Sequence, residues 1–390
     1  MTALEKLLVC LPAAPEFCYD WAGLRAIPTL REWFTRMKET PQNPEWHGEG
    51  DVWKHTRMVC NALTELAEFR AMADGPRNAL ALAALMHDVG KVRCTRLEND
   101  RWVSPRHAPV GAQIARALLW RDFGLCGAPE AQQLREGICL LIRYHTAPLH
   151  LIEGDRPAVR ALKLAANGEL TPWFTLRALC LLSEADVRGR IAPDVQEQLD
   201  TIALSRELAQ EEGCLDGPYS FASECTKRAL FAGGNVWKDQ VLYDDTWGEV
   251  ILMCGLPGTG KDTWIYAQRP DLPTVCLDDL RRELGVRPED NQGRVVQAAK
   301  ERAKEYLRAK QPFIWNATSL TALRKQQIDL FEGYHARVRI AYLETDWAEN
   351  LHRNAGRAAA VPEDVICQML NKLEPPERSE ARRVDWICTK

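Results

Sequence analysis

The sequence lacks long hydrophobic runs, paired cysteines and a strong net charge of either sign. No window approaches roughly 18 uncharged apolar residues, and the first residues contain no basic stretch followed by a long apolar core. A membrane-spanning helix and a secretion signal are therefore not expected. The 13 cysteines are scattered singly from Cys10 to Cys388 without a C-x-x-C pair. This pattern argues against a zinc ribbon or a dithiol redox motif and fits reduced thiols in a cytoplasmic protein.

The composition is that of an ordinary globular protein. Of 390 residues, 46% are hydrophobic and 27% are charged, and the formal net charge is −4. This charge excludes a basic coat for nucleic acid over the whole molecule, but it allows a local basic groove around one strand end. The length is sufficient for two or three hydrophobic cores. No membrane partner is indicated, and a homo-oligomer stays open.

The first half of the chain has helical periodicity. From about residue 20 to 230, apolar residues recur at helical spacing, and no convincing alternating strand pattern occurs. A helix start is expected at Thr171-Pro172, with Thr as the N-cap and Pro at the first helical position. Buried or amphipathic helices are expected at 79–90, 112–120, 134–145 and 175–190.

The second half has a different pattern. After about residue 248, short apolar runs alternate with longer helical stretches, which is typical of a parallel α/β sheet. Because 231–248 has few periodic features, we place the domain boundary near residue 240. The predicted organisation is an all-α domain over 1–240, linker included, and an α/β domain over 241–390. Strands are expected at 249–254, 274–278, 312–318 and 337–344.

A glycine-rich loop follows the first of these strands. GLPGTGKD, from Gly255 to Asp262, lies between the strand EVILMC and the helical stretch DTWIYAQ. This context distinguishes a phosphate-binding loop from an ordinary glycine turn, because the loop must curl so that its N–H groups and the helix N-terminus face the phosphates. Lys261 would bring its charge to the β- and γ-phosphates. The expected nucleotide-binding residues of the loop are Gly255, Gly258, Thr259, Gly260, Lys261, Asp262 and Thr263.

The loop departs from the usual motif at one position. Ser or Thr normally follows the lysine and binds Mg²⁺, whereas this chain has Asp262 followed by Thr263. A carboxylate is also a good hard-oxygen ligand, so the sequence leaves the Mg²⁺ ligand open between these two residues.

Further polar residues follow the later strands. The second strand leads into LDDLRREL, where Asp278 can accept the proton of an attacking hydroxyl and Arg281 can bind a substrate phosphate. Asn316 and Thr318 end the third strand. Arg353 and Arg357 are four residues apart, so on a helix they would share one face and could close over the nucleotide phosphates as a lid.

GLPGTGKDTW, LDDLR and RNAGRAAAVPEDVI closely resemble the polynucleotide 5′-hydroxyl kinases of the bacteriophage and bacterial RNA-repair type, over most of 248–375. The resemblance implies a P-loop kinase fold with a helical lid, which uses ATP or another NTP with Mg²⁺. It implies that Asp278 is the general base and that Arg281 contacts the phosphate next to the 5′-hydroxyl. By the same resemblance Arg353 and Arg357 bind the nucleotide phosphates, and Arg357 stabilises the transfer.

The helical half contains six of the eight histidines. ALMHDVGK places His87 and Asp88 at the end of an apolar helix, and His55 and Asp186 are further candidates for one divalent site of mixed nitrogen and oxygen ligands. A single such histidine is more often an ordinary core or surface residue, but the ordered set favours a site.

His107 and His145 could hold a second metal bridged by Asp88, and His47 could line the site. Lys91 and Arg106 are candidates for binding a substrate phosphate, with ordinary solvated charges as the alternative.

The order H…HD…H…H…D resembles the HD superfamily of all-α metal phosphohydrolases, over roughly 40–190. GEGDVWKHT and ADVRGR especially resemble the HD domain of some bacterial tRNA nucleotidyltransferases, a phosphatase and 2′,3′-cyclic phosphodiesterase. The resemblance implies a first metal on His55, His87, Asp88 and Asp186, such as Mn²⁺, Ni²⁺, Co²⁺ or Mg²⁺. Bound metal would activate water and neutralise phosphate oxygens.

The whole chain is similar to bacterial fusions of an HD domain with a polynucleotide kinase. This resemblance implies end healing of nucleic acid, with RNA favoured over DNA: the kinase phosphorylates a 5′-hydroxyl, the HD domain removes a 2′,3′-cyclic, 2′- or 3′-phosphate, and a ligase can follow. Two alternatives remain. One is an HD nucleotidase joined to a small-molecule or nucleoside kinase, and the other is a nucleotide-driven switch or binding protein with a degenerate HD site.

Overall fold

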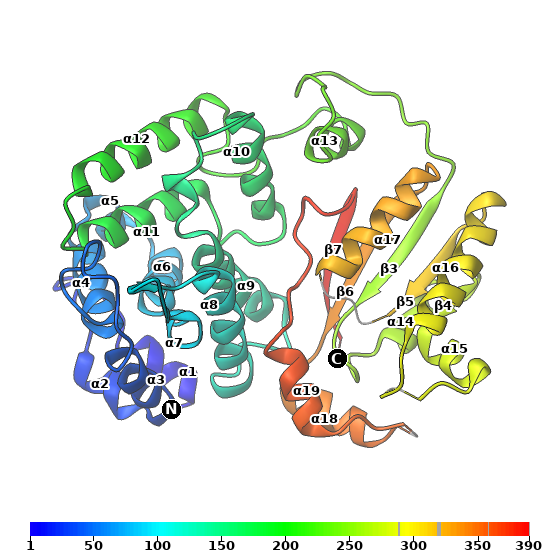
Figure 1. Cartoon of the computed structure of the whole chain (residues 1–390), viewed down its shortest axis with the longest axis horizontal. Helices are drawn as coiled ribbons and strands as arrows, with labels where there is room; N and C mark the ends of the chain where they lie inside the picture. The colour runs from blue at the N-terminus through cyan, green and yellow to red at the C-terminus, as the bar shows by residue number, and fades with distance from the viewer. Residues whose placement is uncertain (288, 318–320, 358, 390) are drawn as a thin grey trace. The chain divides into compact units, whose positions relative to one another are not determined.

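The chain folds into two compact units (Figure 1). The computed structural model describes residues 1–287, 289–317, 321–357 and 359–389. The first unit comprises Met1–Cys126 and Glu130–Tyr219, and the second comprises Ser220–Lys390 with the short segment Gly127–Pro129. The division lies upstream of the boundary that the sequence predicts near residue 240, because helix α13 (Glu224–Phe231) belongs to the second unit. Ion pairs of Arg228 with Glu332 (2.6 Å) and of Glu224 with Arg378 (2.6 Å) attach it there.

The first unit is helical apart from one small hairpin. Its helices are α1 (Ala3–Leu8), α2 (Trp21–Ala26), α3 (Pro28–Lys38), α4 (Val52–Glu65), α5 (Ala67–Ala71), α6 (Asp74–Met86), α7 (Lys91–Cys94), α8 (His107–Ala117), η1 (Leu118–Asp122), α9 (Pro129–Tyr144), η2 (Ala147–Leu149), α10 (Pro157–Ala165), η3 (Ala166–Glu169), α11 (Leu176–Arg188) and α12 (Val195–Glu211).

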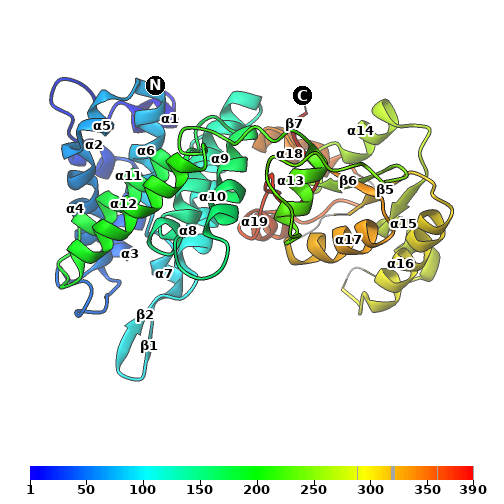
Figure 2. The ribbon, with the colours of Figure 1, turned by 90° about the horizontal axis from the view of Figure 1, so that it is seen from above.

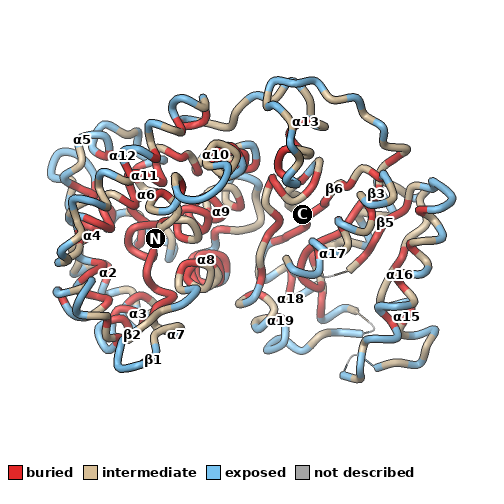
Figure 3. The backbone as a smooth tube through the Cα atoms, turned by 45° about the horizontal axis from the view of Figure 1, so that its top comes forward, coloured by how far each residue is buried: buried red, intermediate tan, exposed pale blue. Residues whose placement is uncertain are grey.

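Helices α4, α6 and α11 pack against one another at the centre of this unit. The α6 segment 79–86 is apolar on every side and is completely buried, as a helix surrounded by other helices must be. Figure 3 shows buried backbone running through this interior. The packing matters for function because the ends of these three helices carry four of the predicted metal ligands.

Two local predictions in the first unit are wrong. The strands β1 (Arg96–Glu98) and β2 (Arg101–Val103) form an antiparallel hairpin where no strand is expected, since each is only three residues long and exposed. The helix expected after Thr171-Pro172 begins later, at Leu176, because Thr175 caps it by accepting from the Ala178 N–H. The Thr171 hydroxyl instead donates to the Gln133 carbonyl (2.8 Å).

The second unit is built on a parallel sheet. Its strands are β3 (Glu249–Cys254), β4 (Thr274–Cys276), β5 (Phe313–Asn316), β6 (Arg337–Glu344) and β7 (Arg383–Cys388), in the order β4-β5-β3-β6-β7. The helices are α13, α14 (Lys261–Gln268), α15 (Leu277–Leu284), α16 (Gly293–Arg308), α17 (Thr321–Gly333), α18 (Trp347–Ala355) and α19 (Glu363–Leu370). The sequence indicates the first four strands and misses β7.

Alternate residues of the central strand face opposite layers of helices. Ile251 and Met253 pack with Trp264 and Ile265 of α14. On the other face, Phe331 of α17 contacts the rings of Phe313 and Trp315 of β5. Figure 2 shows α14 on one side of the sheet and α17 on the other. The loop after β3 therefore leaves the middle of the sheet at its carboxyl edge, where ligands of open α/β sheets bind.

No helix in the described part of the chain is both long and apolar enough to cross a membrane.

Candidate active sites

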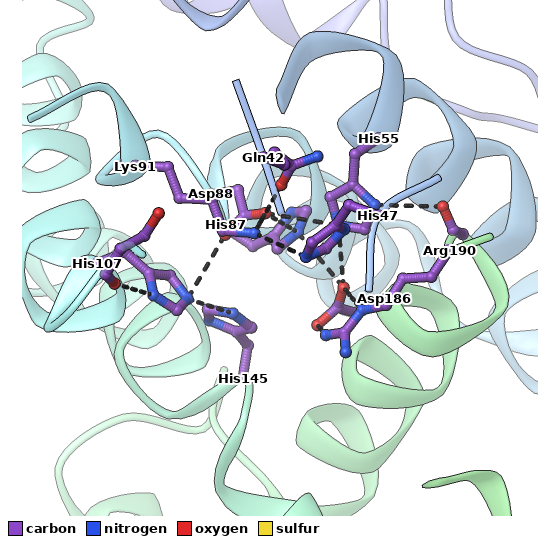
Figure 4. A network of polar contacts seen from close by, with 12 residues as sticks. Gln42, His47, His55, His87, Asp88, Lys91, His107, His145, Asp186 and Arg190 are labelled. Atoms are coloured by element: carbon purple, nitrogen blue, oxygen red, sulfur yellow. Dashed lines mark hydrogen bonds and ion pairs between the residues drawn. The ribbon is translucent and has the colours of Figure 1, made fainter. Parts of the chain in front are cut away.

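Four predicted ligands from three helices come close together in the first unit (Figure 4). His55 lies in α4, His87 caps the end of α6, Asp88 follows it, and Asp186 lies in α11. His55 Nε2 is 3.0 Å from Asp186 Oδ1 and 3.4 Å from Asp88 Oδ2. His87 Nε2 is 3.4 Å from Asp88 Oδ2 and 3.9 Å from Asp186 Oδ1. His55, His87 and Asp88 therefore have ligand atoms close enough together to hold one cation, and Asp186 lies beside the two histidines.

The other carboxylate oxygen of Asp88 faces a second group. Asp88 Oδ1 is 3.6 Å from Nε2 of His107, the first residue of α8. His107 Nε2 is 3.4 Å from Nε2 of His145, which follows α9. His55, His87 and Asp88, and likewise Asp88, His107 and His145, each form a group that could hold a cation. Asp88 belongs to both groups, one oxygen to each.

The four imidazoles are oriented by their second nitrogens. The Nδ1 atoms of His87, His107 and His145 lie 2.8, 2.9 and 2.8 Å from the carbonyls of Ala84, Ser104 and Ile142 respectively. His55 Nδ1 lies 2.9 Å from Glu49 Oε1. A carbonyl can only accept, so the tautomer with the proton on Nδ1 is assigned, and the Nε2 lone pair then faces the centre. This is the arrangement that metal-binding histidines use.

Two glycines allow these helices to approach closely. A side chain at Gly90 would overlap with the His107 carbonyl, and one at Gly189 would come within 2.6 Å of the Val59 N–H nitrogen. Gly90 thus lets α8 bring His107 next to Asp88, while Gly189 lets α11 bring Asp186 next to His55 of α4. The sequence shows both glycines beside ligands, but their role depends on distant segments, so sequence reasoning missed it.

Two positively charged side chains contact the carboxylates of the cluster. Lys91 Nζ is 2.8 Å from Asp88 Oδ2, and it donates to Gln42 Oε1 (2.8 Å). The Arg190 guanidinium pairs with Asp186 Oδ2 at 2.5 Å. Both side chains are close enough to the metal-ligand cluster to neutralise an anionic ligand there. Lys91 was a sequence candidate for phosphate binding; Arg190 was missed, although it stands four residues after Asp186.

The charges of the cluster suit a cation. Burial opposes ionisation of Asp88 and Asp186, but Lys91 and His87 act on the first and Arg190 on the second, so the pKa of each carboxyl is well below its usual value. Burial lowers the pKa of His145 to about 3 and also lowers that of His107. At His55, burial is outweighed by the hydrogen bonds to Asp186 and Glu49, which raise the pKa. The ionised carboxylates and the neutral imidazoles of His107 and His145 are in the protonation states that metal ligands need.

Buried polar atoms of the cluster test whether its residues fit a cation. His87 Nε2 and both Asp88 oxygens are buried without a hydrogen-bond partner among the described residues, and the Lys91 contact lacks hydrogen-bond geometry. Nitrogen and oxygen ligands held roughly 2.0–2.2 Å from one cation lie about 3.0–3.6 Å apart, close to the separations found here. The residues present therefore fit a divalent cation.

Two further histidines lie outside the ligand groups around Asp88. His47 Nδ1 contacts Glu49 (2.8 Å) beside the cluster, whereas His150 is exposed and pairs with Glu153.

The second unit carries the glycine loop in the expected strand–loop–helix setting. Gly255, Gly258 and Gly260 have φ of +137°, +84° and +83°, a region that side chains disfavour. A side chain at Gly258 would also come within 2.7 Å of the Asn350 carbonyl. Thr259 is buried and its hydroxyl donates to the Leu256 carbonyl (2.9 Å), so it braces the loop.

Lys261 begins α14 and folds back over the loop. Its Nζ donates to the carbonyls of Gly255 (3.0 Å) and Leu256 (2.8 Å). Burial lowers the pKa of Lys261 to about 8. The carboxylates of Asp262 and Asp278 oppose that shift in pKa, and the charge of Arg357 adds to it. Asp278 and Arg357, distant in sequence, thus act on the lysine of the loop.

The residues after Lys261 remain open to solvent. Asp262 and Thr263 are exposed in the first turn of α14. Asn316, at the end of β5, donates through Nδ2 to Asp262 Oδ1 (2.7 Å) and so fixes this carboxylate at the carboxyl edge of the sheet. Thr318 lies outside the described residues.

Asp278 and Arg281 form an ion pair on α15, one turn apart. The Asp278 side chain is 66% exposed, and Arg281 Nε donates to Gln292 Oε1 (2.7 Å). The Asp278 carboxylate is therefore accessible to the hydroxyl group of an acceptor molecule of any length, and the Arg281 guanidinium lies beside it.

The predicted helical face of Arg353 and Arg357 is wrong. Helix α18 ends at Ala355, with Gly356 as its C-cap, so only Arg353 is helical. Arg353 still lies beside the loop: its Nη1 donates to Thr389 Oγ1 (3.1 Å), and that hydroxyl donates to the Thr259 carbonyl (3.0 Å). Thr389, just beyond β7, was missed because the sequence does not show that β7 returns to the loop.

Comparisons with known proteins match each unit to a different family. Residues 52–181 match the family model of the HD domain, and residues 250–376 match that of an AAA domain. Ribonuclease Y of Roseiflexus sp. (strain RS-1) is 29% identical over 143 residues, which cover 34% of this chain and about a quarter (25%) of that protein. The chain thus joins a helical HD domain of the phosphohydrolase type to a P-loop kinase-like domain with a parallel sheet, which confirms the predicted fold class.

Proposed function

We propose that this chain prepares both ends of a broken nucleic-acid strand, with RNA as the favoured substrate. The kinase unit transfers the γ-phosphate of ATP or another NTP to a 5′-hydroxyl. The HD unit removes a 2′,3′-cyclic, 2′- or 3′-phosphate. The observation that carries this proposal is that one chain contains a phosphate-donor loop with an exposed carboxylate–arginine acceptor pair and, separately, a cation cluster suited to phosphate hydrolysis.

The hydrolase assignment is supported by the arrangement around Asp88. A divalent cation there would act as a Lewis acid toward phosphate oxygens. Lys91 and Arg190 would neutralise the remaining negative charge of the phosphate, since both side chains already contact carboxylates of the site. The hydrogen bonds on Nδ1 hold the imidazoles in place, so the cluster is preorganised before a ligand arrives.

The kinase assignment is supported by charges that converge on the loop. Lys261 and Arg353 lie against the loop, and the charge of Arg357 reaches Lys261, so each can stabilise a phosphoryl group in transfer. Asp278 would accept the proton of the attacking hydroxyl. Arg281 would first release Asp278 and then bind a phosphate next to that hydroxyl.

A polymer acceptor is favoured over a nucleoside by two observations. The exposure of Asp278 leaves room for a strand to continue away from the site, and a nucleoside offers no neighbouring phosphate to Arg281. The similarity to a protein named Ribonuclease Y supports RNA as the substrate class.

The proposal is tested with one substrate. The full chain is incubated with ATP, Mg²⁺ or Mn²⁺ and an oligoribonucleotide that has a 5′-hydroxyl and a 2′,3′-cyclic phosphate. Mass spectrometry should show a product with a 5′-phosphate and a 3′-hydroxyl. Faster conversion of free nucleosides and nucleotides than of the oligonucleotide would instead support the nucleotidase and small-molecule kinase.

A further inference from the structure

Two arginines of the first unit lie over the same indole ring. The guanidinium carbons of Arg36, in α3, and Arg93, in α7, are 4.4 Å and 5.8 Å from the centre of the Trp33 ring. The indole is 8% exposed, whereas Arg36 is half-buried and Arg93 is exposed. The ring therefore holds two cations close to the surface by cation–π attraction.

These arginines, like Arg57, have no carboxylate partner among the residues that the structure describes. Arg70 pairs with Glu65 and Arg77 with Asp74, but no ion pair within 4.0 Å involves Arg36, Arg93 or Arg106 in the part of the chain that the structure describes. Cation–π contact holds a guanidinium without occupying its N–H donors, whereas a carboxylate would occupy them. The donors of these side chains remain free for an anion.

The charges of this group repel one another, and two of the arginines are close in sequence to residues of the cation cluster. Burial and the charge of Arg36 both lower the pKa of Arg93. Burial raises the pKa of the Cys94 thiol, and the charges of Arg106, Arg96 and Arg93 oppose that rise, so these arginines lie near Cys94. Arg93 follows Lys91 by two residues, and Arg106 directly precedes His107. We call Arg36, Arg93 and Arg106 the arginine cluster.

We propose that the arginine cluster binds backbone phosphates of a polynucleotide strand whose terminal phosphate lies at Asp88. This proposal rests on the proposed hydrolase function and names the substrate class of that site. Guanidinium groups pair well with phosphate oxygens, and an anion between like charges relieves their repulsion. A mononucleotide has its phosphate at the metal ligands and none left for the cluster. Only a strand with further phosphodiesters can occupy both places.

Kinetics on substrates of different length test the proposal. The full chain and its Arg36→Ala, Arg93→Ala and double variants are given a 2′,3′-cyclic mononucleotide or oligoribonucleotides with the same end. For the longer substrates, KM should rise about tenfold per arginine removed. For the mononucleotide, KM and kcat should not change. Arg57→Ala is the matched control, because Arg57 is also exposed and lies over an indole (Trp21, 5.3 Å) but outside the cluster.

A binding measurement separates failure of this proposal from failure of the hydrolase assignment. Anisotropy of a labelled single-stranded RNA with a 5′-phosphate is followed against salt concentration for each variant. The slope of log affinity against log salt should fall by about 0.7 per arginine removed. If no cyclic phosphate is hydrolysed but the slope falls, the hydrolase assignment fails and strand binding stands. An unchanged slope together with an unchanged oligonucleotide KM overturns strand binding. If Arg36→Ala does not fold, the Arg93→Ala variant decides the question, because Arg93 is exposed.

Discussion

At the scale of single residues, Asp88 connects two ligand groups of the first unit. One of its oxygens faces His55, His87 and Lys91, and the other faces His107. A neutral side chain of the same shape would keep the packing but remove the negative charge shared by both groups. The substitution should therefore weaken cation binding and not only the stability of the fold.

We expect Asp88→Asn to abolish stabilisation by divalent cations. A cation at 100 times its Kd stabilises the folded state by about 2.7 kcal/mol, which corresponds to roughly 5–10 °C in the Tm of a unit of this size. Thermal unfolding with and without Mn²⁺ or Ni²⁺ measures this shift. Asp155→Asn, at an exposed loop position, should keep the full shift. An unchanged shift in Asp88→Asn would mean that the cation binds elsewhere.

The ligand residues could be found from sequence because His and Asp carry distinctive chemistry and stand in a recognisable order. Their orientation could not. Which nitrogen of His87 or His145 faces the centre depends on carbonyls at the ends of α6 and α9, three residues before each histidine. Thr389 was beyond reach for a related reason, since its contact with Arg353 exists only after β7 joins the sheet.

At the scale of elements, the approach of α8 to the turn after α6 decides whether the second ligand group forms. Gly90 lies directly against the start of α8, so an added methyl group must push the two segments apart. Overpacking of this kind costs about 1–3 kcal/mol. The displacement would move His107 away from Asp88 and leave His55 and His87 in place.

We therefore expect Gly90→Ala to lower Tm and to weaken the binding of a second cation more than that of the first, as measured by calorimetric titration. The matched control is Gly217→Ala, because a side chain at Gly217 would meet no atom within 4 Å. Equal loss of both cations would show that the glycine supports the whole cluster.

Most elements were predictable because their periodicity is set by burial on one face or on all faces. The exceptions have local causes. The hairpin β1–β2 is short and exposed, so no burial pattern marks it. The strand β7 pairs only with β6 at the edge of the sheet, and four of its six residues are partly exposed. Helix α18 ends early at Gly356, which a spacing of four between arginines does not reveal.

At the scale of the whole molecule, the two sites draw their residues from separate units. The predicted cation ligands all belong to the first unit, whereas the phosphate loop, Asp278 and Arg281 belong to the second. The described side-chain contacts of Asp88 are with residues of the first unit, and the ion pair of Asp278 is with Arg281. Each of the two activities, 5′ phosphorylation and phosphate removal, should therefore persist when the other is lost.

Asp278→Ala should abolish 5′ phosphorylation and leave removal of the 2′,3′-cyclic phosphate unchanged, because it deletes the proton acceptor without touching the cation ligands. Asp88→Asn should have the opposite effect. Both rates are followed on the same oligoribonucleotide by separating its four end states. Asp279→Ala, at a neighbouring exposed carboxylate that pairs with Arg282, controls for the loss of a charge on α15. Loss of both activities in either variant would contradict separate sites.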